Sequence, residues 1–282
     1  MLNAILTSPN QVNSYNPVIE YFDSLKNSWD GKDHIDRLCD FLKAHDFDDK
    51  EEPDYYQKRL NRLVKKWIVS TVACVYGIRP NDAMLGFVNA EGDIGKTTLI
   101  QSFVPKCLEE YYIASDKESK MFRISPSFAM KFIINFDEFV CLTKATENEF
   151  KSNMSRLKMD IKRQGENFFS QVPRIASCMF TSEKTQEKGG FLFTSDSGFL
   201  RRIATIELEE ILKEYKEEID FDQVWAQAVA LYLSSSFEYG FDSQDHKDFQ
   251  EYNLRYVIET SIDKLIRTWY RKLEKGEEGI FR

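Results

Sequence analysis

Short, almost continuously apolar runs recur through the middle of the chain, each followed by a polar segment. Such runs are typical of strands that are buried on both faces of a mainly parallel sheet. After the first run, apolar residues recur at helical spacing up to Val104, and Pro105 then blocks continuation of the helix. The pattern therefore predicts an α/β fold. The expected strands are Met84–Val88, Lys131–Glu138, Ile175–Phe180 and Ile203–Leu208.

Helical patterns flank this region on both sides. Residues 17–80 are mainly helical in pattern, and an apolar stripe from Leu60 to Val75 marks the clearest helix. Beyond the last strand, residues 209–218 suit a charged surface helix or linker, and residues 222–233 and 257–270 have further helical patterns. We expect an N-terminal helical region (1–80), an α/β core (81–210) and a C-terminal helical region (211–282).

The segment after the first strand nearly matches a phosphate-binding loop. Residues 90–97 read Ala-Glu-Gly-Asp-Ile-Gly-Lys-Thr, one residue short of the pattern G-x-x-x-x-G-K-[ST], because Ala90 replaces the first glycine. In such a loop, backbone N–H groups surround a nucleotide's phosphates, the lysine reaches the β- and γ-phosphates, and the threonine hydroxyl ligates Mg²⁺. The alternative is a tight turn that contains Gly-Lys-Thr by chance. The expected contacts to ATP are Glu91, Gly92, Asp93, Ile94, Gly95, Lys96, Thr97 and Thr98, with Mg²⁺ on Thr97.

Polar residues follow the second and third expected strands. Asp137 and Glu138 end the second strand, where we expect Asp137 to hold Mg²⁺ through water and Glu138 to orient or deprotonate an attacking water. Alone, this pair suits a solvated acidic turn, but together with the loop it predicts a P-loop ATPase. Thr181, Ser182 and Glu183 follow the third strand, and each is a candidate sensor of the nucleotide.

A pair of arginines precedes the fourth expected strand. Arg201 or Arg202 could act as a finger on the γ-phosphate that a neighbouring subunit binds, because a guanidinium suits the charge that spreads over that group. An interpretation that fits the pair equally well is two solvated arginines at the start of a strand.

A basic hairpin is predicted between the acidic strand and the sensor strand. Residues 151–174 contain six basic and two acidic residues, and residues 158–163 and 167–172 flank the sequence Gln-Gly-Glu, which is typical of a hairpin turn. Lys162 and Arg163 are the candidate contacts to DNA phosphates, which would be independent of base sequence. The alternative is a solvated loop.

The overall composition is that of a globular protein. The chain has 282 residues, 42% hydrophobic and 30% charged, with a net charge of −8, which argues against indiscriminate polyanion binding but not against a local basic track. No apolar stretch approaches the ~18 residues of a membrane span, and the N-terminus lacks the pattern of a secretion signal. Five cysteines without a C-x-x-C pair favour a reducing compartment. We therefore expect a cytoplasmic protein that is not bound to a membrane.

Further short segments, on both sides of the loop, carry information through their order along the chain. They are Trp29–Lys32, Asp36–Leu38, Lys66–Val69, Asn135–Glu138, Lys151, Arg163, Pro173–Arg174, Leu200–Arg202 and Trp225–Ala228. This order resembles the virulence-associated protein E family, P-loop ATPases of phages, plasmids and genomic islands, over about residues 20–235. The chain departs from the family pattern at Ala90, at Asp93, at Glu183, where the family usually has asparagine, and at Gly198–Leu200 before the arginine pair.

The resemblance implies an AAA+-like core similar to superfamily 3 helicases. It implies an ATP-hydrolysing homo-oligomer, for which a hexameric ring is one form, that translocates DNA during replication of a mobile element. Lys96, Glu138 and an arginine of the pair would be its catalytic residues. The rival hypothesis is a non-translocating ATP-binding switch for a partner protein, which the altered loop and the acidic surface would suit. A packaging or defence motor would share the loop but not the order of segments.

Overall fold

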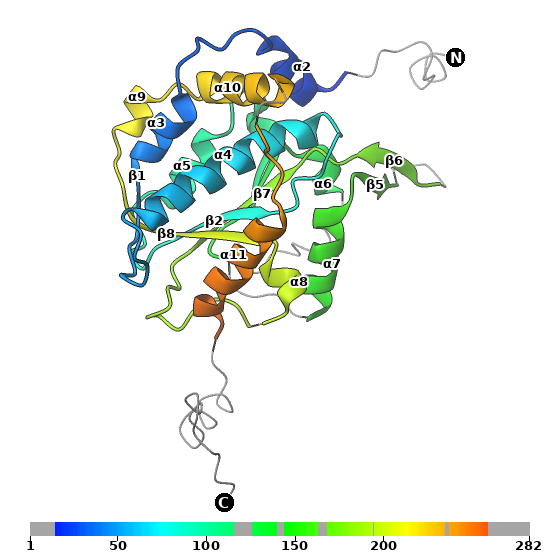
Figure 1. Ribbon diagram of the computed structural model, residues 1–282. Helices are drawn as coiled ribbons and strands as arrows, with labels where there is room; N and C mark the ends of the chain where they lie inside the picture. Colours follow the sequence, from blue (N-terminus) through cyan, green and yellow to red (C-terminus); the bar gives the residue numbers. More distant parts are fainter. Residues whose placement is uncertain are drawn as a thin grey trace, which may run out of the picture.

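A six-stranded sheet runs through the centre of the residues that the structure describes, with helices on both of its faces (Figure 1). This computed structural model describes residues 15–115, 126–139, 144–162, 168–193, 195–234 and 237–258. The strands lie in the order β1-β8-β2-β7-β4-β3, and all neighbours are parallel except β1, which is antiparallel to β8. Their bounds are β1 Leu42–Ala44, β2 Met84–Val88, β3 Tyr112–Ser115, β4 Ile133–Phe136, β7 Ser177–Ser182 and β8 Ile203–Ile211.

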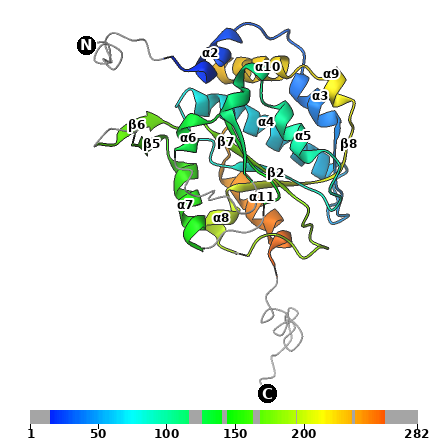
Figure 2. The same cartoon turned by 180° about the vertical axis from the view of Figure 1, so that it is seen from behind.

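Helices cover the sheet from two sides, and Figure 2 shows the same arrangement from behind. Within the described ranges, none of them combines the length and apolarity that a bilayer crossing requires. The α-helices are α2 Pro17–Ser24, α3 His34–Asp40, α4 Tyr55–Val75, α5 Lys96–Ser102, α6 Ser127–Met130, α7 Lys144–Ser155, α8 Ser197–Leu200, α9 Tyr215–Glu218, α10 Phe221–Ser234 and α11 Ser243–Asn253, and the 3₁₀ helices are η1 Lys106–Tyr111 and η3 Leu254–Tyr256.

Alternate side chains of the central strands build two separate hydrophobic cores. In β2, Leu85 and Phe87 belong to the core under α2, α3, α4, α5 and α10, whereas Met84 and Val88 belong to the core under α7, α8 and η3. This division follows from the strand geometry, because successive side chains point to opposite faces of a sheet. All five residues of β2 are buried, as expected of a parallel strand covered on both sides.

The four strands expected from the apolar runs are confirmed as β2, β4, β7 and β8, and α4 carries the expected stripe. Two details were not expected. Residues 42–44 form a strand inside the mainly helical N-terminal region, and three residues are too few to show a period. β8 continues to Ile211, so only the end of the charged segment 209–218 is helical. Of the expected helix at 257–270, residues 259–270 lie outside the described residues, and Val257 instead bridges to Leu192.

The parallel register brings the ends of three strands together at one edge of the sheet, here called the carboxyl edge. β7 lies between β2 and β4, with Val88 opposite Ser182 and Phe136 opposite Phe180. The segments that follow these strands therefore meet there. Ligands of open α/β sheets bind at this edge, so the topology points to it as the place to look for a site.

Packing at the centre of the sheet requires glycine at position 86. A Cβ atom on Gly86 would lie 1.7 Å from the ring of Phe180 on β7. We expect Gly86→Ala to lower the free energy of unfolding by about 1–3 kcal/mol or more, as over-packed cores do. The measurement is urea unfolding of wild type, Gly86→Ala, Phe180→Leu and the double variant. The smaller leucine makes room for the methyl group, so Gly86→Ala is expected to cost less in the Phe180→Leu background; an equal cost in both backgrounds would contradict this account.

Candidate functional site

Residues 89–95 connect β2 to α5 at the carboxyl edge and form the loop that the sequence predicts to bind phosphate. Gly95 has φ of 95°, in the left-handed region that favours glycine. Asn89 anchors the loop: its Nδ2 donates to the Leu208 carbonyl at 2.7 Å, and its Oδ1 accepts the Glu91 N–H at 2.6 Å. Ala90 is not among the described non-glycine residues with positive φ, so this position accepts alanine without backbone strain.

Lys96, the first residue of α5, is buried with only 4% of its surface exposed. Its Nζ donates to the carbonyl oxygens of Glu91 at 2.9 Å and Asn89 at 3.4 Å. Burial lowers the pKa of Lys96 from its usual range, and the nearby carboxylate of Glu183 opposes that shift. No carboxylate among the described residues forms a salt bridge with Lys96. A buried ammonium without an anionic partner is costly, so this position favours an anion at the loop.

Asp137 joins the loop to the two neighbouring strands. Its Oδ1 accepts the hydroxyl of Thr97 at 2.8 Å and the hydroxyl of Thr181 at 2.7 Å. Thr97 lies on α5, Thr181 on β7, and Asp137 directly follows β4. A carboxylate and two hydroxyls present the oxygen ligands that Mg²⁺ prefers, so the arrangement fits that ion.

Glu138 follows in a strained backbone conformation. Its φ is 47°, and its N–H donates to the Thr181 hydroxyl oxygen at 3.0 Å. The next residue, Phe139, is buried and donates its N–H to the Thr181 carbonyl at 2.7 Å. The Glu138 side chain is exposed at the carboxyl edge. A non-glycine residue held at positive φ is characteristic of functional sites, because packing must compensate its strain.

The three sensor candidates have different surroundings. Thr181 contacts Asp137, as described above, whereas the buried Ser182 hydroxyl accepts the Lys184 N–H at 3.2 Å. Glu183 lies against the loop, because a Cβ on Gly92 would come within 2.9 Å of its Oε1. Of the three, Thr181 is therefore closest to the Asp137 carboxylate and Glu183 is closest to the phosphate loop.

The arginine pair lies at the opposite edge of the sheet, here called the amino edge. Met84 pairs with Ile203 at the starts of β2 and β8, directly after the arginines, whereas the loop follows the other end of β2. The Arg202 guanidinium donates to the Gly198 carbonyl and, at 2.9 Å, to the Ser155 hydroxyl. Arg201 is exposed, and its guanidinium has no hydrogen bond among the described residues. Within one chain, the arginines therefore do not reach the loop.

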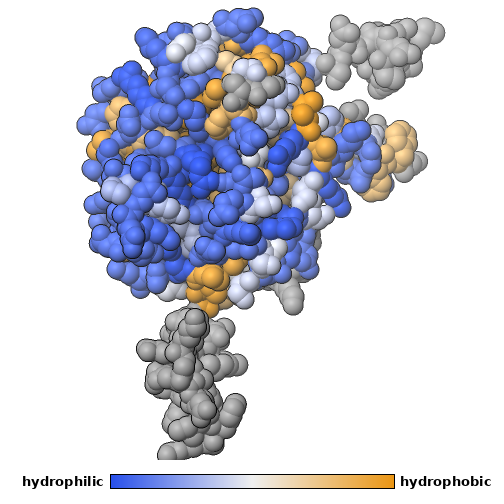
Figure 3. All heavy atoms as spheres, in the orientation of Figure 1, coloured by the Kyte–Doolittle hydropathy of each residue, from blue (hydrophilic) through white to orange (hydrophobic). Residues whose placement is uncertain are grey.

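The predicted basic hairpin is confirmed as β5 (Lys158–Ile161) paired antiparallel with β6 (Ser170–Pro173), and it projects from the body of the molecule (Figure 1). Lys162 is exposed at the end of β5, and Arg163 lies outside the described residues. Phe168 and Phe169 just before β6 were not predicted, and they are 65% and 67% exposed. Figure 3 shows an apolar area on the projecting hairpin. Two adjacent phenylalanines beside a polar turn were the signal that could have identified them.

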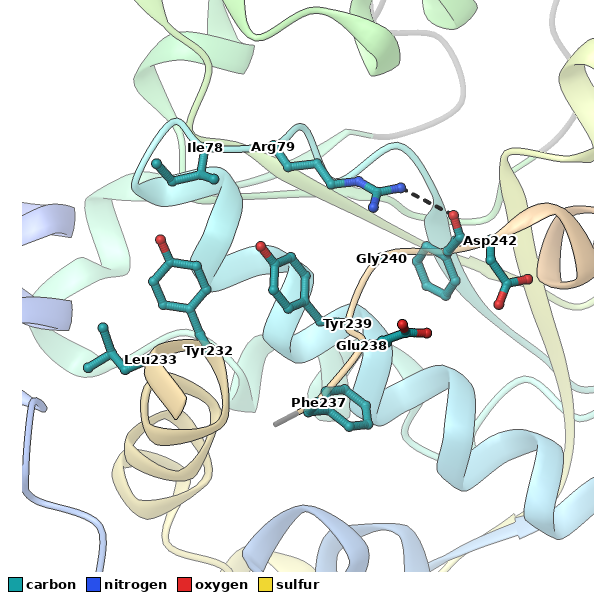
Figure 4. A pocket seen from close by; sticks show the side chains of 10 residues that line it. Ile78, Arg79, Tyr232, Leu233, Phe237, Glu238, Tyr239, Gly240 and Asp242 are labelled. Carbon is teal, nitrogen blue, oxygen red and sulfur yellow. Dashed lines mark hydrogen bonds between the residues drawn. The ribbon is translucent and has the colours of Figure 1, made fainter. Parts of the chain in front are cut away.

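Two further features were not predicted. Lys188, in the segment after β7, donates to the Ala90 carbonyl and places a second ammonium group beside the loop. At the other side of the molecule, a hollow of about 700 Å³ lies between the end of α4 and the segment after α10 (Figure 4). Tyr232 and Tyr239 line it, and Arg79 donates to the Phe241 carbonyl at its rim. This hollow shares no residue with the loop, so it is separate from the candidate site.

Comparisons with known proteins agree with the motif order. A sequence model described as the virulence-associated protein E-like domain matches residues 22–257. The apo structure of the C-terminal region of NrS-1, residues 305–718, is similar at 16% identity and a TM-score of 0.49, with 85% of this chain and 55% of that chain covered. A second apo structure of that region, in its A form, has 17% identity and a TM-score of 0.48, with 85% and 54% covered. The chain thus spans about half the length of these solved chains, and no curated protein sequence matches it.

The position of Thr181 generates a prediction about stability. Thr181→Val removes the donor to Asp137 and the acceptor of the Glu138 N–H, so we expect the free energy of unfolding to fall by about 1–3 kcal/mol, as for buried polar groups that lose a partner. Thr181→Ser keeps the hydroxyl and is expected to remain closer to wild type. Urea unfolding of the three proteins measures this. If Thr181→Val and Thr181→Ser change the free energy of unfolding equally, the Thr181 hydroxyl does not stabilise the carboxyl edge.

Proposed function

The chain belongs to the virulence-associated protein E-like family, and on that premise we propose that it is a P-loop ATPase that acts as an oligomeric, helicase-like DNA translocase in the replication of a mobile element. The observation that carries this proposal is the Asp137 carboxylate, which receives hydroxyls from Thr97 and Thr181 directly beside the buried Lys96. Three strand ends thus bring together a cation for phosphate, oxygen ligands for Mg²⁺ and an acid for water activation.

The residues at the carboxyl edge fit magnesium ATP. The Lys96 ammonium is buried among carbonyl oxygens, so its positive charge has no negative charge to balance it. It can therefore neutralise the charge of the β- and γ-phosphates. Thr97 and Asp137 would hold Mg²⁺, which when bound supplies positive charge to the transferring phosphate. Glu138 lies next to them and would orient the attacking water, with its backbone fixed by the Thr181 hydroxyl.

The position of the arginines supports action between subunits. Met84 and Val88 are the two ends of β2, and they lie about 13 Å apart at a rise of ~3.3 Å per residue. The loop follows Val88, whereas Arg201 lies beyond the Met84 end. An arginine at the amino edge can therefore complete only a site that belongs to another copy. Arg201 suits that role better than Arg202, because Arg202 is held by Gly198 and Ser155.

A second candidate function, the ATP-binding switch without translocation, draws support from Glu183. This carboxylate lies against Gly92 of the loop, where its charge opposes phosphate binding. A switch would bind ATP with negligible turnover and no response to DNA, whereas the proposed translocase hydrolyses ATP faster when DNA is added. DNA-stimulated ATP hydrolysis by the whole chain separates the two functions.

Complementation between variants tests the shared site. Glu138→Gln and Arg201→Ala are each expected to reduce DNA-stimulated ATP hydrolysis at least about tenfold. In an equal mixture, about a quarter of the interfaces of a head-to-tail ring pair an intact glutamate with an intact arginine. The mixture is therefore expected to regain a measurable part of the wild-type rate.

Mixtures of Lys96→Ala with Glu138→Gln provide the control, because both changes affect the same half of the site and no interface is restored. Native mass spectrometry confirms that mixed oligomers form. If mixed oligomers form and activity does not return, Arg201 as a finger from a neighbouring subunit is ruled out.

The exposed phenylalanines generate a prediction about single-stranded DNA. Phe168→Ala with Phe169→Ala is expected to weaken binding of a single-stranded oligonucleotide about tenfold or more, because stacking of a base on an aromatic ring contributes about 1–3 kcal/mol. Lys162→Ala should instead reduce the salt dependence of binding. Fluorescence anisotropy at several salt concentrations measures both effects. Leu254→Ala, an exposed apolar residue of η3, is the matched control, and an equal loss there would contradict a specific role of the hairpin.

A further inference from the structure

A hollow of about 630 Å³ opens beside the first half of the phosphate loop. Asn89, Ala90 and Glu91 form one of its walls, so the hollow and the loop share residues. Its other walls come from three segments that are distant in sequence: the one after β1, the one after β7, and the end of β8. The volume falls within the range typical of small-molecule sites. A molecule held by the loop could therefore extend into this hollow.

Buried polar groups line the hollow. Thr185 is 4% exposed, and its hydroxyl has no hydrogen-bond partner among the described residues. Glu207 is 8% exposed, and one of its carboxylate oxygens accepts the Tyr256 hydroxyl at 2.7 Å. Buried polar groups are normally paired, so an unpartnered hydroxyl in the same hollow as a carboxylate held by Tyr256 points to a ligand that hydrogen-bonds there.

The wall beside the end of β8 is aromatic, and the His45 N–H donates to the Glu207 carbonyl at 2.9 Å. The rings of His45 and Phe47 lie 4.6 Å apart, nearly perpendicular, and both line the hollow. The Arg255 guanidinium lies 4.0 Å from the Phe47 ring centroid, and it also forms an ion pair with Asp49 at 3.3 Å. A flat ring could pack against this wall, because aromatic groups pair well with one another in such sites.

The acidic side chains that line the hollow disfavour phosphate there, and the Lys188 ammonium, which donates to the Ala90 carbonyl, is not among the lining residues. Glu91, Glu187, Glu207 and Glu209 line it, whereas no lysine or arginine is among its described lining residues. Carboxylates accept hydrogen bonds and repel phosphate oxygens. The hollow therefore suits an uncharged, flat group that carries N–H donors, whereas the phosphates belong on the Lys96 side of the loop.

We propose that this hollow is the nucleobase pocket of the site, and that it selects a purine with an exocyclic amino group, donated to Glu207, over a purine without one. The inference rests on the proposed ATP site and adds to it the base that is recognised and the residues that recognise it. Thr185 supplies a second hydrogen bond to the ring, and the His45–Phe47 wall packs against the ring's face.

Calorimetric titration of the whole chain with magnesium complexes of ATP, ITP and tripolyphosphate tests this pocket. ITP has a purine ring but an oxygen in place of the adenine amino group, and tripolyphosphate has no base. We expect ATP to bind about 10- to 100-fold more tightly than ITP, the range for one hydrogen bond to a charged group. ITP should in turn bind more tightly than tripolyphosphate, because its ring still packs in the hollow.

Two variants locate the contacts. Glu207→Gln is expected to bring the ATP-to-ITP ratio close to one, because an amide can pair with either the amino group or the oxygen. Thr185→Val removes a hydroxyl that has no partner among the described residues, so it should weaken ATP binding without loss of stability. Glu210→Gln is the matched control, since Glu210 is the exposed neighbour on β8 and does not line the hollow.

The thermal stability of Glu207→Gln shows whether its binding change comes from unfolding. Burial raises the pKa of Glu207, whereas the hydrogen bond from Tyr256 and the neighbours His45 and Arg255 lower it and Glu187 raises it. Because the pKa of Glu207 is higher in the folded than in the unfolded chain, its ionised carboxylate lowers the stability of the fold at pH values above the folded-state pKa. This loss of stability disappears as the pH falls through that pKa. Glu207→Gln should therefore melt at or above the wild-type temperature at pH 7 and lose this advantage in acid.

The outcomes separate the pocket from the proposed function. Equal affinities for ATP, ITP and tripolyphosphate overturn the base pocket and leave the phosphate site standing. If none of the three binds, the proposed function fails and the pocket fails with it. A preference for ATP that survives both Glu207→Gln and Thr185→Val places the base elsewhere and also overturns this inference.

Discussion

The candidate site depends on one carboxylate oxygen, Oδ1 of Asp137. It accepts the hydroxyls of Thr97 and Thr181 at 2.8 and 2.7 Å, and so it fixes the start of α5 and the end of β7 relative to β4. The Thr181 oxygen then receives the Glu138 N–H, which holds that residue at positive φ. The proposed water-activating acid and metal-binding acid are therefore positioned by the same hydroxyl. This arrangement is possible only because β7 lies between β2 and β4 in a parallel register.

The parallel sheet also separates the candidate functions by edge. The loop, the acids and Thr181 lie at the carboxyl edge, whereas the arginine pair lies at the amino edge. α7 follows the acidic segment and leads directly into the β5–β6 hairpin, and its Ser155 holds the Arg202 guanidinium at 2.9 Å. Its Lys151 is paired with Glu147 at 3.1 Å and with Asp196, before α8, at 3.3 Å. One helix thus contacts the arginine region and carries the hairpin, which gives a contiguous packed connection between these parts.

The sequence predicted the features that depend on local pattern. Buried parallel strands are apolar along their whole length, so β2, β4, β7 and β8 could be identified, and the strand-loop-helix order located the loop. Features that depend on register and topology could not be predicted: which of Thr181, Ser182 and Glu183 contacts Asp137, and which lies against the loop, depends on the strand end, and the sensor itself stays a prediction. The three residues of β1 are too few to show the alternation of apolar and polar residues that marks a strand. The buried Thr185 and Glu207 could not be recognised, because burial of an isolated polar residue leaves no periodic signal in the sequence.

The arrangement of charge around the loop explains how an acidic chain can favour an anion at one place. The net charge of −8 describes the whole surface, but local fields depend on which groups are desolvated. Lys96 is buried with carbonyl oxygens as its hydrogen-bond partners, so its charge is weakly screened and directed at the loop. Four glutamates line the neighbouring hollow, and the loop backbone from Asn89 to Glu91 lies between them and the Lys96 ammonium, whereas Glu183 lies against the loop itself. A bound molecule with an anionic end and a neutral, donor-bearing end would therefore be aligned in one direction only. Such an alignment is what a nucleotide requires, because its phosphates and its base differ in this way.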